Sequence, residues 1–468
     1  MALVAVILVV APALIASPPG QQASAGSDGS GGRAVAHHPG GAVVSSRAVR
    51  SRSPDARLHR IRVKGQQLNA SEPTLGLTRN GDLFYTAFQS NVRIEVVKSR
   101  DKGRSWRIVS PNLGGRNAHL VSLDPYLYVD KATSRVFNID LTVACSYLSF
   151  TDGKGWTTNP LACGRPVNDH QTLFAGPPAT STTIGYPNVV YYCWNDVGSS
   201  SCSKSLDGGI TFLPTGTPAY PGFDPTNDDP GFEGVPGFCG GLHGHGFVAH
   251  DGTVLLPKGH CGQPWLSISK DEGLTWTRVQ VARNGTADHE ADAVMDRKGN
   301  IYYTWIARNR LPYLAVSRNK GKTWSKPMMI APPKVTEANL PAMDIGGRGK
   351  IAIVYMGTEN ARGPIKKRKY DNVTWNGYMT MTAKALNRRP VFYSSTVNEK
   401  SDPLIRTDCG PGRCRAVFDF IDVVVARDGT PWGAFVDGCI AVCATRAGVS
   451  NIGSDAIVGR LVGGPSLR

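Results

Sequence analysis

The chain has 468 residues, of which 53 are glycine and 32 are proline, and only 19% of them are charged. This composition excludes a disordered tail protein, a collagen and a coiled coil, and its glycine and proline content argues against a helical bundle, so an all-β protein is expected. The net charge of +16 favours anionic partners such as acidic polysaccharide. The sequence lacks the basic residues interleaved with aromatic ones that are typical of nucleic-acid binders, so no nucleic-acid partner is expected.

The N-terminal residues 1–25 have the pattern of a secretory signal peptide. Residues 2–15 form the one long apolar run, which at about 14 residues is too short to span a bilayer, and Ala-Ser-Ala at residues 23–25 offers a cleavage site. Residues 26–56 are rich in Gly, Ala, Ser and Arg without apolar periodicity, which predicts a flexible leader. We therefore expect a secreted monomer without a membrane span, in which residues 57–468 form one domain.

Ten cysteines, an even number, agree with secretion. They fall as sequence neighbours four to about twenty residues apart, and no CxxC motif occurs, which favours disulfides across hairpins over a zinc site. The expected pairs are Cys145 with Cys163, Cys193 with Cys202, Cys239 with Cys261, Cys409 with Cys414, and Cys439 with Cys443.

Four segments share the pattern Ser-x-Asp/Asn-x-Gly-x-Ser/Thr-Trp/Phe, and they lie at residues 99–106, 205–212, 269–276 and 317–324. A looser copy lies at 149–156. Apolar or β-branched residues flank the segments, so each one predicts a turn between two strands. In such a turn the Asp or Asn accepts backbone N–H groups, the Gly supplies a positive φ, and the aromatic residue packs back on the hairpin.

This pattern resembles the Asp-box, or BNR repeat, of sialidases and related β-propellers, and the resemblance covers roughly residues 70 to 330. It implies a propeller in which the boxes lie at the periphery of the blades, away from the ligand face. The Asp residues of the boxes are accordingly expected to be structural.

A second repeat locates the blades. Turns ending at Gly81, Gly252, Gly299, Gly349 and Gly429 each follow an apolar run and precede a β-rich one, which predicts the first hairpin of a blade. With two irregular first strands at 124–129 and 169–174, the units begin near residues 71, 123, 168, 240, 288, 338 and 418. Sialidases have six blades, and the sixth unit, which holds the basic cluster 366–369 and no box, leaves the count open. The expected fold is an all-β, six- or seven-bladed propeller of four-stranded blades with Asp-box turns.

The repeat also aligns polar residues at the start of each first strand. Nine positions before a turn glycine lie Glu72, His243 and Glu290, and the irregular blades add Asp124 and Asp169. Seven positions before lie His245, Asp292 and Asp422. Positions nine and seven share one face of a strand, and the innermost strand of a blade begins at one rim of the channel, so these side chains should converge there. By the same alternation His170 and His289 should face the other way.

Such a group of carboxyl and imidazole groups has three interpretations. The first is acid and base catalysis by Glu72, Asp124, Asp169, Glu290 and Asp292, with His243, His245 and Asp422 binding substrate. The second is a divalent metal ion held by His243 and His245 with neighbouring carboxylates. The third is a hydrated channel lined by hydrogen-bonded polar groups.

No sialidase catalytic residue can be carried over by motif. The family has an arginine in its first blade where this chain has Glu72, and Tyr355, Tyr378 and Tyr393 stand in no matching context. The leading hypothesis is an exported, glycan-directed hydrolase or lyase that acts at the mouth of the channel, and it would be a glycosidase if it is an enzyme. The alternative is a non-catalytic propeller that binds glycan, cell wall or a protein partner.

Overall fold

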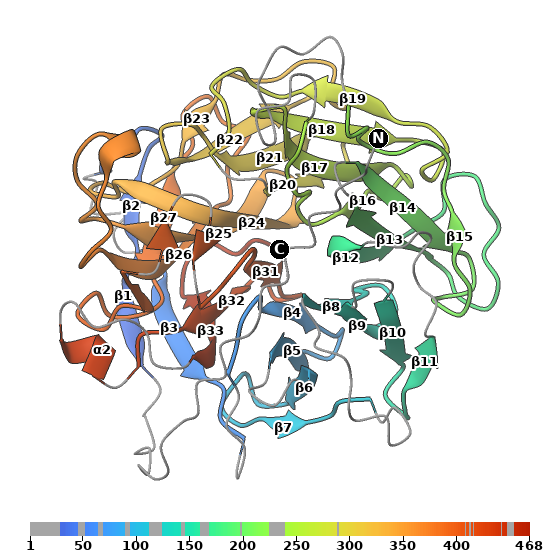
Figure 1. The fold of residues 1–468 in the computed structure, drawn as a ribbon, viewed down its shortest axis with the longest axis horizontal. Helices are drawn as coiled ribbons and strands as arrows, with labels where there is room; N and C mark the ends of the chain where they lie inside the picture. The colour runs from blue at the N-terminus through green and yellow to red at the C-terminus, as the bar shows by residue number, and fades with distance from the viewer. Residues whose placement is uncertain are drawn as a thin grey trace, which may run out of the picture.

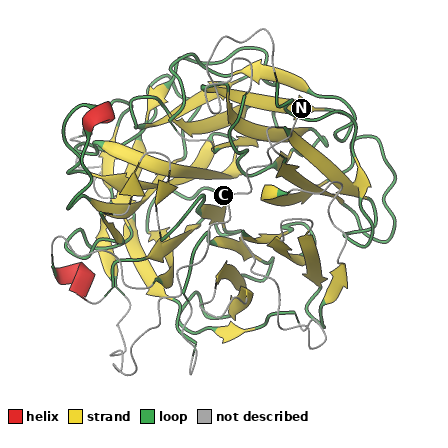
Figure 2. Cartoon of the chain, in the orientation of Figure 1, coloured by secondary structure: helices red, strands yellow, loops and turns green. Residues whose placement is uncertain are grey.

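The computed structural model describes residues 29–44, 52–63, 69–88, 94–111, 124–141, 146–159, 168–196, 199–223, 239–287, 290–407, 409–410, 413–414, 416–440, 442–446 and 454–468. They form an all-β propeller of seven blades around a central channel (Figure 1). Helix in these ranges is confined to η2 (Ile365–Lys367) and α2 (Val442–Thr445), and strands dominate the cartoon (Figure 2). No helix in the described ranges is long and apolar enough to cross a membrane.

Each of the first five blades is a four-stranded antiparallel sheet in chain order, with its first strand innermost. Blade 1 consists of β4 (Thr74–Leu77), β5 (Leu83–Phe88), β6 (Ile94–Ser99) and β7 (Arg107–Ile108). Blade 2 consists of β8 (Pro125–Val129), β9 (Val136–Leu141), β10 (Ser146–Thr151) and β11 (Thr157–Asn159). Blade 3 consists of β12 (Asp169–Gly176), β13 (Val189–Asn195), β14 (Ser200–Ser205) and β15 (Leu213–Pro214). Blade 4 consists of β16 (Phe247–Val248), β17 (Val254–His260), β18 (Gln263–Ser269) and β19 (Thr277–Gln280). Blade 5 consists of β20 (Ala291–Met295), β21 (Ile301–Ile306), β22 (Pro312–Ser317) and β23 (Met328–Met329).

The last two blades also use strands from the N-terminal part of the chain. Blade 6 consists of β24 (Glu337–Gly347), β25 (Lys350–Thr358), β26 (Thr374–Thr382) and β27 (Phe392–Thr396), with β2 (Val35–His37) on its outer edge and β28 (Ile405–Arg406) beside β26. Blade 7 consists of β31 (Asp422–Val425), β32 (Pro431–Asp437), β33 (Asp455–Val462) and β3 (Asp55–Arg60), with β1 (Ser30–Arg33) outermost. The pairing of β3 with β33 closes the ring by joining the two ends of the chain.

Seven blades settle the count that the sequence left open. The sixth unit is a genuine blade, and its first hairpin turns at Gly349 as the repeat predicted. The four Asp-box segments connect the third and fourth strands of blades 1, 3, 4 and 5. In the third box, Asp271 accepts the backbone N–H of Thr275 at 2.9 Å, and Gly273 has a φ of +84°.

Part of the expected leader is ordered. Residues 30–33 and 35–37 are strands β1 and β2, whereas residues 26–56 were expected to be flexible. Both strands are short and attach to the outer edges of existing sheets by backbone hydrogen bonds. Three or four residues held in this way need no apolar alternation of their own, so they carry no periodic signal. The expected signal peptide, residues 1–25, lies outside the described residues.

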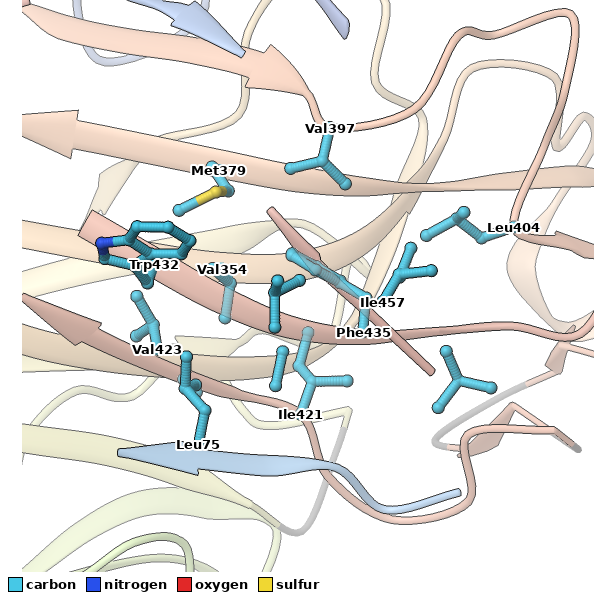
Figure 3. Packing of buried hydrophobic residues seen from close by; sticks show 14 of the residues in the cluster. Leu75, Val354, Met379, Val397, Leu404, Ile421, Val423, Trp432, Phe435 and Ile457 are labelled. Carbon is cyan, nitrogen blue, oxygen red and sulfur yellow. The ribbon is translucent and has the colours of Figure 1, made fainter. Parts of the chain in front are cut away.

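The blades pack through buried apolar side chains between neighbouring sheets. Figure 3 shows part of the largest cluster, in which Trp432 and Phe435 of β32 meet Val354 of β25 and Met379 of β26. Leu75 of blade 1 belongs to the same cluster, so the closing blade is packed on both sides.

Four of the five predicted disulfides are confirmed: Cys193–Cys202, Cys239–Cys261, Cys409–Cys414 and Cys439–Cys443. Several disulfides in one chain indicate an extracytoplasmic location. Cys145 and Cys163 lie outside the described residues, so their pairing stays a prediction.

Candidate functional site

The innermost strands line the channel, and each is an edge strand whose outward backbone groups need partners from outside its own sheet. At six seams a side chain of one blade accepts a backbone N–H from the innermost strand of the next blade or, for Gly246, from the residue directly before that strand. The pairs are Thr74 with Leu127, Asp124 with His170, Thr172 with Gly246, Asp292 with Met343, Asp344 with Val425, and Asp422 with Leu75, at 2.5 to 3.2 Å. Several polar residues that the repeat singled out therefore hold neighbouring blades together.

Asp292 and Asp422 each accept a second backbone N–H, from Ala293 and Val423 respectively, both at 2.7 Å. Burial nevertheless raises the pKa of both carboxyl groups, well above the ordinary value for Asp292 and to about 7 for Asp422. Their proximity adds to this effect, because the charge of Asp422 disfavours ionisation of Asp292. These bonds give both residues a structural role that the sequence analysis did not foresee.

A second set of acidic residues lies nearer the rim, which is the end of the channel where the innermost strands begin. Glu72 is 2% exposed and Asp124 is 5% exposed, and the two side chains interact directly. Burial raises the pKa of Glu72 well above its ordinary value, and the negative charges of Asp124 and Asp419 raise it further. Burial likewise raises the pKa of Asp124 to about 7. The pair therefore retains a proton near neutral pH.

Asp169 and Arg413 are the exposed members of this group. Arg413 forms a two-pronged ion pair with Asp419, and Glu72 and Glu290 also act on its charge. Burial and the charge of Asp419 raise the pKa of Asp169, whereas Arg413 opposes the shift. We call Glu72, Asp124, Asp169, Glu290, Arg413 and Asp419 the rim cluster.

His243 lies near the rim and is neutral. His243 is fully buried, and burial lowers its pKa to about 3. Its ring centroid lies 5.5 Å from that of His170, whose backbone N–H donates to Asp124 at 3.0 Å. The expectation that His170 faces away from the channel is wrong, because a bulge after Asp169 and a φ of +52° at His170 interrupt the strand alternation. His289 lies outside the described residues.

Phe420 separates the rim cluster from the deeper residues. Its ring centroid lies 5.2 Å from that of His170 and 5.9 Å from those of Tyr126 and His245. The segment that carries it bonds to Glu72, which donates its backbone N–H to the Val417 carbonyl at 2.9 Å and accepts the Asp419 N–H at 3.3 Å. The predicted residues thus converge on one channel but form two layers.

On the other side of Phe420, His245, Asp292 and Asp422 lie at the inner end of a cavity of about 280 Å³. The cavity extends past Leu127 and Val424 to the ends of the innermost strands, at Val129, Gly176 and Val248. His245 Nδ1 lies 3.1 Å from the Tyr126 hydroxyl and 3.7 Å from Asp422 Oδ1. Burial lowers the pKa of His245 to about 4.

The geometry gives the predicted metal pair little support. Within the described ranges, the one set of three potential ligand atoms lying within 4.8 Å of one another comes from Cys239, His260 and Cys261. Both of those cysteines are in a disulfide, so they are not free thiolate ligands.

Arg413, Asp419 and Phe420 reach the channel from the connection between blades 6 and 7, and none of the three was predicted as a site residue. That connection contains the hairpin β29 (Cys409–Gly410) and β30 (Arg413–Cys414), closed by a disulfide. Phe420 stands nine positions before Gly429, the same offset as Glu72 before Gly81, so the repeat alone could have located it. The hairpin offered no such signal, because its place over the channel depends on tertiary packing.

No protein-family model and no curated protein sequence matches the chain. Among solved structures, a protein of unknown function from Dyadobacter fermentans aligns over 86% of this chain and 98% of its own, with 12% identity and a TM-score of 0.43. The leech intramolecular trans-sialidase aligns over 80% of this chain and 66% of its own, with 15% identity and a TM-score of 0.39. The Aleuria aurantia lectin, in complex with Fucα1-6GlcNAc, aligns over 66% of this chain and 91% of its own, with 13% identity and a TM-score of 0.39. These similarities are distant.

Proposed function

We propose that the protein is an exported, carbohydrate-directed hydrolase that cleaves a glycosidic bond at the rim cluster. The carbohydrate class rests on the resemblance of its four Asp-box repeats to those of sialidases and related propellers. The reaction class rests on the chemistry of the cluster, because a propeller fold by itself does not select a function.

The observation that carries the proposal is the contrast between the Glu72–Asp124 pair and Asp169. Glycoside cleavage generally requires one protonated and one ionised carboxyl group. The buried pair retains a proton near neutral pH. Desolvation and the charge of Asp419 raise the pKa of Asp169 as well, but Asp169 is the accessible member of the three, and the cation Arg413 opposes the rise and favours the charged form. In this proposal the pair supplies the proton to the leaving group, and Asp169 acts as the base.

A non-catalytic carbohydrate-binding role is the second candidate, and the seam hydrogen bonds favour it. Asp124, Asp292 and Asp422 all use carboxyl oxygens to bind backbone N–H groups. A polar channel built to hold blades together would have the same composition without any catalysis.

A substrate screen separates the two candidates. Wild-type protein and the Asp169→Asn variant are assayed for cleavage and for binding of sialoside, uronide and neutral glycoside substrates, with and without EDTA. We expect EDTA-resistant turnover of one class, with a loss of about 100-fold or more in the variant, the usual scale for removing a general base. Binding without turnover by either protein would favour the second candidate and overturn the first.

A further inference from the structure

The channel cavity beyond Phe420 is separate from the rim cluster and plays no part in the proposed cleavage. Its walls are largely apolar, with Leu127, Phe174 and Val424 among the lining residues. Its inner end is polar, because the carboxyl groups of Asp292 and Asp422 meet the imidazole of His245 there. A cavity with an apolar body and a few convergent polar groups is typical of a small-molecule site.

The charges of the lining are unbalanced. It contains four carboxyl groups, from Asp130, Asp292, Asp344 and Asp422, and one lysine, Lys131. Lys131 is ion-paired with Asp344 and is 47% exposed, so it lies at the solvent side of the cavity. Among the described lining residues, the inner end therefore contains acidic groups without a basic side chain bonded to them.

His245 adds a further unsatisfied group at the inner end. Its Nε2 atom is buried and has no hydrogen-bond partner among the described residues. With the proton on Nδ1, which faces the Tyr126 hydroxyl and Asp422, Nε2 is an acceptor. A ligand at this end would meet the carboxyl group of Asp422, which is 15% exposed, beside this buried imidazole.

The spacing of these acceptors favours an organic cation over a metal ion. Asp292, Asp422 and His245 do not form a set of ligand atoms within 4.8 Å of one another, which one compact ion would require. The apolar part of the 280 Å³ cavity would accommodate a hydrocarbon body, and the accessible part of the Asp422 carboxyl group would accept hydrogen bonds from an ammonium group attached to it. We propose that this cavity binds a small organic ammonium ion, whose N–H groups donate to Asp422.

The affinity should depend on pH. The groups that act on Asp422 are Tyr126, His245, Asp292, Asp344 and Lys131. Burial holds the pKa of Asp422 at about 7, and a bound cation favours its charged form. Binding below pH 7 therefore releases a proton, so the affinity should increase from pH 5 to pH 8.

Titration calorimetry with cyclohexylammonium chloride, against cyclohexanol as the neutral probe of similar shape, tests the proposal at pH 5 and pH 8. We expect the ammonium ion to bind more tightly than the alcohol and more tightly at pH 8. Removing the competing cation with Lys131→Gln should increase the affinity about threefold or more, and Asp422→Asn should decrease it about tenfold or more. The Lys131 variant keeps the test decisive if Asp422→Asn does not fold, because Lys131 is an exposed residue.

Three results would overturn the proposal. They are equal binding of the ammonium ion and the alcohol, no binding of either, and an unchanged affinity in Lys131→Gln. Stabilisation by Ca²⁺ but not by cyclohexylammonium would also contradict it. None of these results bears on cleavage at the rim cluster.

Discussion

The carboxylate of Asp422 in the last blade accepts the backbone N–H of Leu75 in the first blade, at 3.0 Å. This bond closes the ring on the channel side, while the pairing of β3 with β33 closes the same blade on the outside. The acidic residues along the channel thus have two effects on the folded protein. Their hydrogen bonds join the blades, but their buried charges oppose folding once they ionise.

Asp140 belongs to neither the rim cluster nor the channel cavity, so it shows how a buried acid alone affects folding stability. Burial raises its pKa to about 7, far above the ordinary value of 3.8. The folded state therefore binds a proton that the unfolded state has lost, so this contribution to stability is present at low pH and disappears as the pH rises through 7. We expect Asp140→Asn to be more stable than wild type at pH 8, by on the order of 1 to 3 kcal/mol, with a smaller difference at pH 5.

Urea unfolding at both pH values measures this difference, with the exposed Asp371→Asn as the control. Parallel stability curves for wild type and Asp140→Asn would show that Asp140 is already ionised at neutral pH.

Glu272 shows the opposite pH dependence. Burial raises its pKa, but Lys204, Ser181 and backbone N–H groups donate to it and together lower the pKa to about 2. Its contribution to stability is therefore present above pH 4.5 and is lost as the pH falls from there to about 2. We expect Glu272→Gln to lose on the order of 2 to 3 kcal/mol at pH 7 and to lack the wild-type decline below pH 4.5.

Thermal melts of Glu272→Gln between pH 2 and pH 7 test this clamp between blades 3 and 4, with Lys270→Gln as a charge-changing control nearby. An acid decline equal to that of wild type would rule out Glu272 as its source.

The Asp-box turns should matter for stability alone. Asp271 accepts the backbone N–H and the hydroxyl of Thr275, at 2.9 and 2.6 Å. Asp271→Ala should cost on the order of 1 to 3 kcal/mol because these donors lose their acceptor. Asp271→Asn should cost less, since Asn319 accepts the Thr323 N–H at 2.9 Å in the equivalent turn. Chemical denaturation measures the stability of each variant, and an activity assay on the folded variants accompanies it. An Asp271→Ala variant that keeps full stability but loses activity would show that the box has a functional role.

The architecture could be predicted from the sequence because each blade repeats a local signal. The turn glycines and the box residues act within their own hairpins, so they are visible without tertiary information. Strands β1 and β2 had no such signal, since β2 attaches through backbone bonds to β27 of blade 6, and β1 attaches to β3, which itself joins the last blade only by pairing with β33.

The candidate site was predictable only in part. Strand alternation brought Glu72, Asp124 and His243 to one channel, but it could not show that Phe420 divides the channel. It also failed at His170, where a bulge reverses the direction of the side chain. The hydrogen bonds between blades could not be predicted either, because the N–H donors to Asp292 and Asp422 come from other blades.

The most direct test of cleavage at the rim cluster compares two buried acids with the same seam bond. Asp124 accepts the His170 N–H at 3.0 Å, and Asp292 accepts the Met343 N–H at 2.7 Å. The two acids lie on opposite sides of Phe420, so only Asp124 belongs to the rim cluster. Turnover of the best substrate from the screen should fall about 100-fold or more in Asp124→Asn, the scale expected for a lost proton donor, and change little in a folded Asp292→Asn. Equal turnover by the two variants, with both folded, would contradict the assignment of catalysis to the rim cluster.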